Sequence, residues 1–267
     1  MSDYQLSLVF FTIFCQWGVG SVLGVTLYCS LPEAEDRPLN TKAVAALIWL
    51  ICLVGSLCLL SQLDNPAMAY RALFSAGGSW LSREVTASVI LNGCTTLWMV
   101  SYYADGKKGV QQLLGGFTSV LGLIAILVSA QVYFQAELHP EWNTLLTHLT
   151  FLSTALTLGM ATVIVFIRAY GHEVPLTIRY LQGFSVIVTL VVMTLFVRHL
   201  DYSATHNLLT AYQLLGSVLA GGLLFVMVRN SGRYRPEWML VTALVMVSGE
   251  IAGRLSFYSS MTAGAPW

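Results

Sequence analysis

The chain has 267 residues and as many basic as acidic side chains, so its formal net charge is zero. Only 10% of its residues are charged, whereas soluble domains carry about 25%. The mean hydropathy of +0.71 excludes an ordinary soluble enzyme, and the absence of a basic cluster in the sequence argues against nucleic-acid binding.

Long uncharged stretches indicate how the chain is organised. Residues 6–31 and 43–63 contain no charged side chain, and about 20 apolar residues in a helix cross a ~30 Å hydrocarbon core. A β-barrel would instead alternate polar and apolar residues over ~10 positions. We therefore predict an all-α polytopic membrane protein that forms a single domain over 1–267. Its eight predicted transmembrane helices are residues 6–31, 43–63, 84–103, 112–134, 146–168, 178–197, 208–228 and 238–260.

The distribution of Lys and Arg predicts the orientation in the membrane. Eight spans place both termini on one side, and cytoplasmic loops are the basic ones. The side opposite the termini holds nine cations and the terminal side three, so we expect both termini and the long connection 64–83 to face the periplasm, with the chain in the bacterial cytoplasmic (inner) membrane. The nine are Arg37, Lys42, Lys107, Lys108, Arg168, Arg179, Arg229, Arg233 and Arg235; the three are Arg71, Arg83 and Arg198. Trp80, Trp142 and Trp238 lie at predicted span edges, where aromatic anchors are common.

Cysteine and histidine usage predicts no metal centre or haem in this chain. A b-type haem held by two histidines needs both inside spans at matching depth, and only His148 of the five histidines falls within one. The sequence contains no C-x-x-C motif, the usual sign of zinc or iron–sulfur ligation. We expect buried thiols at all five cysteines, which are Cys15, Cys29, Cys52, Cys58 and Cys94.

Two ionisable residues lie deep in the last predicted span. Glu250 and Arg254 are four residues apart, so they share a helix face and can pair. Each alone would cost about 2.5–3.5 kcal/mol at a helix centre. They form either an ion pair that fixes helix packing or the polar wall of a ligand site or proton path. Gln16 similarly acts either as interhelical glue, beside the close-packing motif Gly20-x-x-x-Gly24, or as a site residue.

A second polar group is expected at the outer side. Gln62 ends the second span and Glu84 begins the third, so the two can converge on one pocket. A simpler interpretation of Glu84 is structural, because Ser82 could be an N-cap and an acid in the first turn favours the helix dipole.

Three segments resemble the membrane-anchor subunit of bacterial dimethyl sulfoxide reductase. They are G-E-x-x-G-R-x-x-F-Y from Gly249 to Tyr258, F-T-I-F-x-Q from Phe11 to Gln16, and SQLDNPAMAYRALFSAGGSWLSREVTAS, which aligns without a gap. The last segment keeps five family residues, namely Pro66, Gly77, Leu81, Ser82 and Glu84.

The resemblance implies eight spans with outer termini and a role in anaerobic respiration. It implies that the chain holds an iron–sulfur subunit and a molybdopterin catalytic subunit on the outer face, oxidises menaquinol, or ubiquinol, and is inactive alone. It also implies that Glu84 is a quinol ligand and catalytic proton acceptor. Where the family commonly has His this chain has Gln62, and where it has Arg this chain has Met68, with Arg71 one turn later as a substitute. His148 or His199 could assist in place of the absent His. The predicted quinol-binding residues are Glu84, Gln62, Gln16, Arg71, Glu250 and Arg254.

Two other functions remain open from the sequence. A small-molecule or ion transporter would place polar residues at the midplane on broken helices, and only Glu250 and Arg254 are deep. A pure structural anchor would bind partners without quinol chemistry, an alternative that the missing His at Gln62 leaves open. Neither the terminal electron acceptor nor the choice between menaquinol and ubiquinol follows from the sequence.

Overall fold

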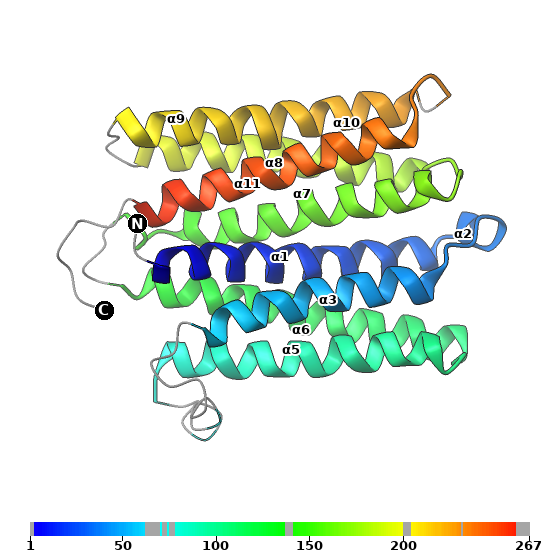
Figure 1. Ribbon diagram of the computed structural model, residues 1–267, viewed down its shortest axis with the longest axis horizontal. Coiled ribbons are helices and arrows are strands. Elements are labelled where there is room, and N and C mark those ends of the chain that lie inside the picture. Colours follow the sequence, from blue (N-terminus) through cyan, green and yellow to red (C-terminus); the bar gives the residue numbers. More distant parts are fainter. Residues whose placement is uncertain are drawn as a thin grey trace.

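The computed structural model describes residues 3–61, 70, 74, 78–136, 141–199, 204–230 and 232–259, with side chains omitted at 3–5 and 204–207. Within these ranges the chain is helical and contains no strand, which confirms the all-α prediction (Figure 1). The helices are α1 (Asp3–Ser30), α2 (Glu33–Asp36), α3 (Thr41–Leu60), α5 (Trp80–Tyr103), α6 (Lys108–Phe134), α7 (Leu145–Ala169), α8 (Leu176–His199), α9 (Ala204–Gln213), the π-helix η2 (Leu214–Leu219), α10 (Ala220–Arg229) and α11 (Pro236–Ser259).

Seven helical segments are long and apolar enough to cross a membrane. They are α1, α3, α6, α7, α8, the continuous segment Leu208–Arg229 and α11. Helix α5 has 24 residues, but Arg83, Glu84 and several Ser, Thr and Asn residues make it less apolar, and it is not among the seven. Seven of the eight predicted spans thus coincide with segments that are long and apolar enough to cross a membrane, and the count of eight spans stays a prediction.

The long helices form two groups of four that pack side by side. Helices α1, α3, α5 and α6 contact one another in the first group, and α7, α8, α9–η2–α10 and α11 do so in the second. The groups meet chiefly where α1 packs against α7, with α6 and α11 adding contacts (Figure 1). Each group contains one buried acid, Glu84 in the first and Glu250 in the second.

Small residues set the close approach of α1 to its neighbours. A Cβ atom added at Gly20 would overlap the carbonyl oxygen of Ala155, and Gly20 lies directly against Gly159 of α7. On the other face of α1, a Cβ at Gly18 would overlap the sulfur of Cys52. Close backbone packing through small residues is the common device of membrane helices.

The cysteines contribute to this packing as thiols. None of the five forms a disulfide; Cys15 and Cys52 are buried, while Cys29, Cys58 and Cys94 are only partly buried. The prediction of buried thiols is therefore right for two positions and wrong for three, because those three side chains lie nearer the surface of the bundle.

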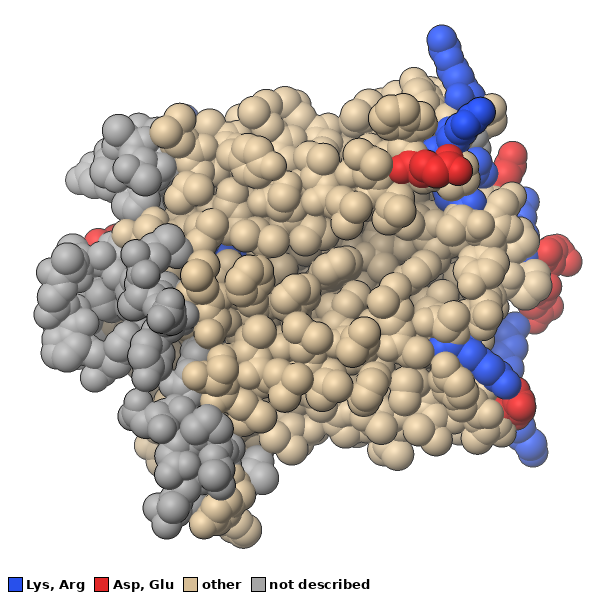
Figure 2. Space-filling view, in the orientation of Figure 1, with Lys and Arg blue, Asp and Glu red and all other residues tan. Residues whose placement is uncertain are grey.

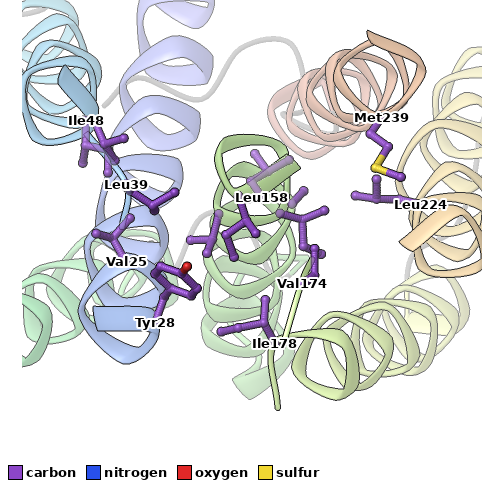
Figure 3. Close-up of a cluster of buried hydrophobic side chains, with 14 of the residues drawn as sticks. Val25, Tyr28, Leu39, Ile48, Leu158, Val174, Ile178, Leu224 and Met239 are labelled. Carbon is purple, nitrogen blue, oxygen red and sulfur yellow. The ribbon is translucent and has the colours of Figure 1, made fainter. Parts of the chain in front are cut away.

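Two buried hydrophobic clusters hold the bundle together. The larger cluster joins α1, α3, α7, α8 and α11, and part of it, including Val25, Leu158 and Met239, appears in Figure 3. The second cluster is rich in aromatic rings and joins α1, α5, α6, α7, α8 and α11. In it Trp142 is fully buried and donates its Nε1–H to the carbonyl of Phe257 at 3.1 Å. The prediction that Trp142 is an interfacial anchor is wrong, because its ring packs inside the bundle.

Charged residues gather at one end of the molecule. Figure 2 shows Lys, Arg, Asp and Glu concentrated at the end where α2 lies, and an uncharged belt along the helices. The ion pairs Lys42–Asp105 and Lys108–Glu35, each at 2.7 Å, are at this end. The opposite end carries the start of α1, the end of α11 and the start of α5 (Figure 1). The guanidinium of Arg83, on α5, lies 4.3 Å from the ring centroid of Trp80.

Candidate functional site: two buried carboxyl groups linked by Arg254

Helix α5 begins with a serine cap. The side chain of Ser79 accepts a hydrogen bond from the backbone N–H of Ser82 at 3.1 Å, the usual N-cap arrangement. The prediction that Ser82 is the cap is wrong, because the helix begins earlier, at Trp80. The first turn of α5 contains no acidic residue, and Glu84 lies beyond it. Helix capping therefore does not explain why an acid is found at this position.

The carboxyl group of Glu84 is buried between α5 and α6. The residue is 3% exposed, and it lies about 6 Å along the axis from the start of α5, at ~1.5 Å per residue. Its Oε1 accepts a hydrogen bond from the hydroxyl of Ser129 at 2.5 Å. Because a buried polar group is costly unless it is hydrogen-bonded, Ser129 lowers the free energy of holding Glu84 at this position.

Glu84 lines a cavity inside the first group of helices, which we call the Glu84 pocket. Its cavity volume is about 20 Å³, room for about one water molecule. Its apolar walls are Phe11, Leu91, Ala125 and Ile126, and polar groups come from Gln16, Ser88 and Ser129.

Gln16 contributes an unpartnered amide nitrogen to the Glu84 pocket. Nη2 of Arg254 donates a 2.7 Å hydrogen bond to Oε1 of Gln16. Since Arg has only donors, this bond fixes which way the amide is turned. Nε2 of Gln16 is buried and has no hydrogen-bond partner among the described residues. The pocket is thus lined by an acceptor, the carboxyl group of Glu84, and by Gln16, whose amide N–H has no described partner.

Arg254 and Glu250 are joined by a hydroxyl group. Among the described residues no direct ion pair connects them. Instead Thr154 donates to Oε2 of Glu250 at 2.7 Å and accepts from Nη2 of Arg254 at 3.3 Å. The guanidinium of Arg254 also lies 3.8 Å from the ring centroid of Phe151, a cation–π geometry. The predicted direct pairing is wrong, because Thr154 on α7 lies between the two groups.

Glu250 and Arg254 line a different cavity, in the second group of helices, which we call the Glu250 pocket. Its cavity volume is about 30 Å³, room for one or two water molecules. Oε1 of Glu250 and Nη1 of Arg254 are buried and have no hydrogen-bond partner within the described parts of the chain. The six predicted site residues are therefore not one constellation. Gln16 and Glu84 share the first pocket, Glu250 and Arg254 the second, and the Arg254–Gln16 bond connects them.

Of the four other predicted participants, the structure describes only the two histidines. Gln62 and Arg71 fall outside the described residues. His148 does not line the Glu84 pocket, and its Nε2 is 3.0 Å from Oε1 of Gln131. His199 is the last residue of α8 and lines neither pocket.

The sequence did not single out Ser129 and Thr154, the two hydroxyl residues that contact the carboxyl groups. Membrane helices contain many Ser and Thr, and most of those here, such as Thr95 and Ser119, bond to carbonyls of their own helix. To single out Ser129 and Thr154, one would have to know which residues of neighbouring helices lie opposite Glu84 and Glu250.

The helical bundle and its buried polar pockets define the class: a multi-pass helical membrane protein with ionisable groups between its helices. The chain belongs to the family of DMSO reductase anchor subunits (DmsC), whose family profile matches residues 1–260. Membership confirms the resemblance found in the sequence, and an anchor subunit implies that the chain works with the other subunits of a reductase complex.

Three relatives support this assignment. The protein is 25% identical over 270 residues to one chain of the anaerobic dimethyl sulfoxide reductase of Haemophilus influenzae, and the match spans 96% of this protein and 94% of the relative. It is 28% identical over 169 residues to YnfH, a chain of an anaerobic dimethyl sulfoxide reductase of Escherichia coli, with 62% and 58% covered. It is 28% identical over 217 residues to one subunit of the sulfite dehydrogenase of Allochromatium vinosum, with 74% and 65% covered.

Proposed function

We propose that this protein anchors a molybdopterin oxidoreductase in the bacterial inner membrane and oxidises a membrane quinol, menaquinol or ubiquinol, for anaerobic respiration. Its partners are an iron–sulfur subunit, which takes the electrons, and a molybdopterin catalytic subunit, both docked on the outer face. The observation that carries the proposal is the buried carboxyl group of Glu84 in a pocket that also presents the unpartnered amide N–H of Gln16.

The Glu84 pocket has the polar groups that a quinol headgroup requires, and its cavity of about 20 Å³ has to widen to admit the ring. Apolar walls suit its ring, and the carboxyl group of Glu84 accepts a hydrogen bond from one hydroxyl. The amide of Gln16, turned by Arg254, donates to a ligand oxygen. No histidine lines this pocket among the described residues, so Glu84 is the group there best suited to accept a proton.

Quinol oxidation needs acceptors for protons and for electrons, and Glu84 can serve as the first. Oxidation of one quinol to a quinone releases two protons and two electrons. Glu84 accepts a proton from the hydroxyl it contacts and passes it to water at the outer end of α5, about 6 Å away along the helix. The second proton leaves by the same route after the first is released. The docked iron–sulfur subunit would supply the acceptor for the two electrons.

Eight crossings with outer termini complete the proposal. Helix α5 runs antiparallel to α6 along the bundle (Figure 1) and contacts both α3 and α6, which supports an eighth crossing despite its polar residues. Lys and Arg side chains gather at the end where α2 lies (Figure 2), which supports a cytoplasmic location of that end, because cytoplasmic loops are rich in Lys and Arg.

The test is Glu84→Gln in membranes that contain the complete complex. We expect quinol-dependent reduction to fall by about 10²–10⁴-fold, the usual contribution of a general base, with unchanged subunit assembly. Glu237→Gln, which removes an exposed acid from α11, is the matched control and should retain full activity. Normal turnover in Glu84→Gln would favour the pure anchor instead.

A further inference from the structure

The Glu250 pocket continues into a groove that reaches the outer surface of the bundle. The groove, with a volume of about 330 Å³, lies between α8 and α9–η2. Three residues, Met193, Val197 and Thr210, line both the pocket and the groove. The other groove residues include Leu214, which is 39% exposed. In a membrane this surface faces lipid, so the pocket opens laterally to the hydrocarbon.

The inner end of this passage is polar and incompletely bonded. Glu250 is 1% exposed and Arg254 is 2% exposed, and both line the pocket. Oε1 of Glu250 and Nη1 of Arg254 have no hydrogen-bond partner among the described residues. Buried polar atoms are normally paired, so a ligand that supplies one donor and one acceptor would complete both.

The local helix geometry keeps this end open. Gln213 lines the pocket directly before the π-helix η2, and single π-turns are frequent at functional sites. A Cβ atom at Gly253 would overlap the amide of Gln213, so the glycine between Glu250 and Arg254 leaves room for that side chain. Thr210 and Ser256 add hydroxyl groups to the same wall.

We propose that the Glu250 pocket is a second, separate binding site for a neutral lipid-soluble hydroxyaromatic molecule of the quinol class. The lateral apolar groove admits a lipid-soluble ligand. The formal charges of Glu250 and Arg254 cancel, which favours a neutral headgroup over an anionic one. The ring of the ligand lies in the groove, and only its hydroxyl, which is about the size of a water molecule, enters the pocket, where it donates to Oε1 of Glu250 and accepts from Nη1 of Arg254. The site goes beyond the proposed function, because it shares neither Glu84 nor its cavity.

The test labels the ligand site without turnover. The complete complex in phosphatidylcholine nanodiscs is illuminated with an azido-naphthoquinone that carries a short isoprenoid tail, and the labelled peptides are identified by mass spectrometry. We expect label on α8 and α9 near Met193 and Ala211, in addition to any near Glu84, and competition by excess unlabelled naphthoquinol.

Two variants and their controls decide the outcome. Val197→Phe narrows the groove and should reduce labelling of α8 and α9 at least about fivefold, whereas Leu195→Phe, on the exposed face of the same helix, should not. Glu250→Gln should weaken labelling and Glu237→Gln should not. Absence of label on α8 and α9, equal labelling in Val197→Phe and Leu195→Phe, or displacement by added phosphatidylglycerol but not by naphthoquinol would overturn the proposal. Because labelling requires no turnover, its result is independent of the outcome of Glu84→Gln.

Discussion

At the scale of single residues, the orientation of the Gln16 amide has a consequence for binding. Arg254 occupies Oε1, so the amide N–H groups are the part that remains for a ligand in the Glu84 pocket. Gln16→Glu keeps an acceptor for Arg254 but removes the donor. We expect the KM for quinol to rise about fivefold, the effect of one hydrogen bond of ~1 kcal/mol, while the complex remains assembled. Steady-state kinetics with a soluble quinol would measure this, and an unchanged KM would exclude Gln16 as a ligand.

Arg254 also stabilises the buried polar centre. Arg254→Met removes the only described cation near Glu250 and leaves the acid buried, so we expect a loss of ~3–5 kcal/mol in the free energy of unfolding. Adding Glu250→Gln in that background should recover part of the loss. Unfolding of the detergent-solubilised protein by SDS, followed by circular dichroism, measures all four members of the cycle. Strictly additive effects would show that the two groups do not interact through Thr154.

At the scale of helices, the contact of α1 with α7 depends on missing side chains. A Cβ at Gly20 would overlap the backbone of Ala155, which cannot move away independently of α7. Gly20→Ala should therefore destabilise the bundle by about 1–3 kcal/mol, the usual cost of overpacking. Gly116→Ala on α6, where nothing lies within 4 Å of the added atom, is the matched control and should be neutral or stabilising. Equal thermal stability of the two variants would contradict the packing described here.

The helices were largely predictable, and their departures from the prediction have physical causes. Hydrophobic length located the spans to within a few residues, since burial in lipid requires about 20 apolar residues. The start of α5 was misplaced from 80 to 84 because its first turn carries Ser and Arg, residues that resemble a loop. The span 208–228 contains a π-helix that was not predicted, because the shift from i→i+4 to i→i+5 bonding leaves no mark in composition.

The candidate site was less predictable than the helices. Glu84, Gln16, Glu250 and Arg254 were identified because ionisable and amide groups are rare in membrane spans. Their division into two pockets depends on which helices face each other, and one sequence does not contain that information. The roles of Ser129 and Thr154 depend on the same cross-helix register.

At the scale of the whole molecule, orientation can be tested directly. The test uses a variant whose five cysteines are replaced by alanine or serine. In this background, Gly78→Cys places a thiol just before the start of α5, and Lys107→Cys places one at the charged end, just after α5. We expect a membrane-impermeant maleimide applied to spheroplasts to label Gly78→Cys, and to label Lys107→Cys only after permeabilisation. The reverse pattern would invert the topology, and labelling of both residues from one side would exclude an eighth crossing by α5.

The hydrogen bond between Arg254 and Gln16 joins residues 238 positions apart, in the first and last helices. During synthesis, Gln16 enters the membrane long before Arg254 is made, so the amide oxygen of Gln16 lacks this hydrogen bond until the last helix has been inserted. A ribosome that stops early would leave a product with polar groups of α1 and α7 facing lipid or one another without their guanidinium partner. The same bond that orients a ligand group thus also marks the completed protein, and only the full-length product presents the polar centre in its closed form to the assembling reductase.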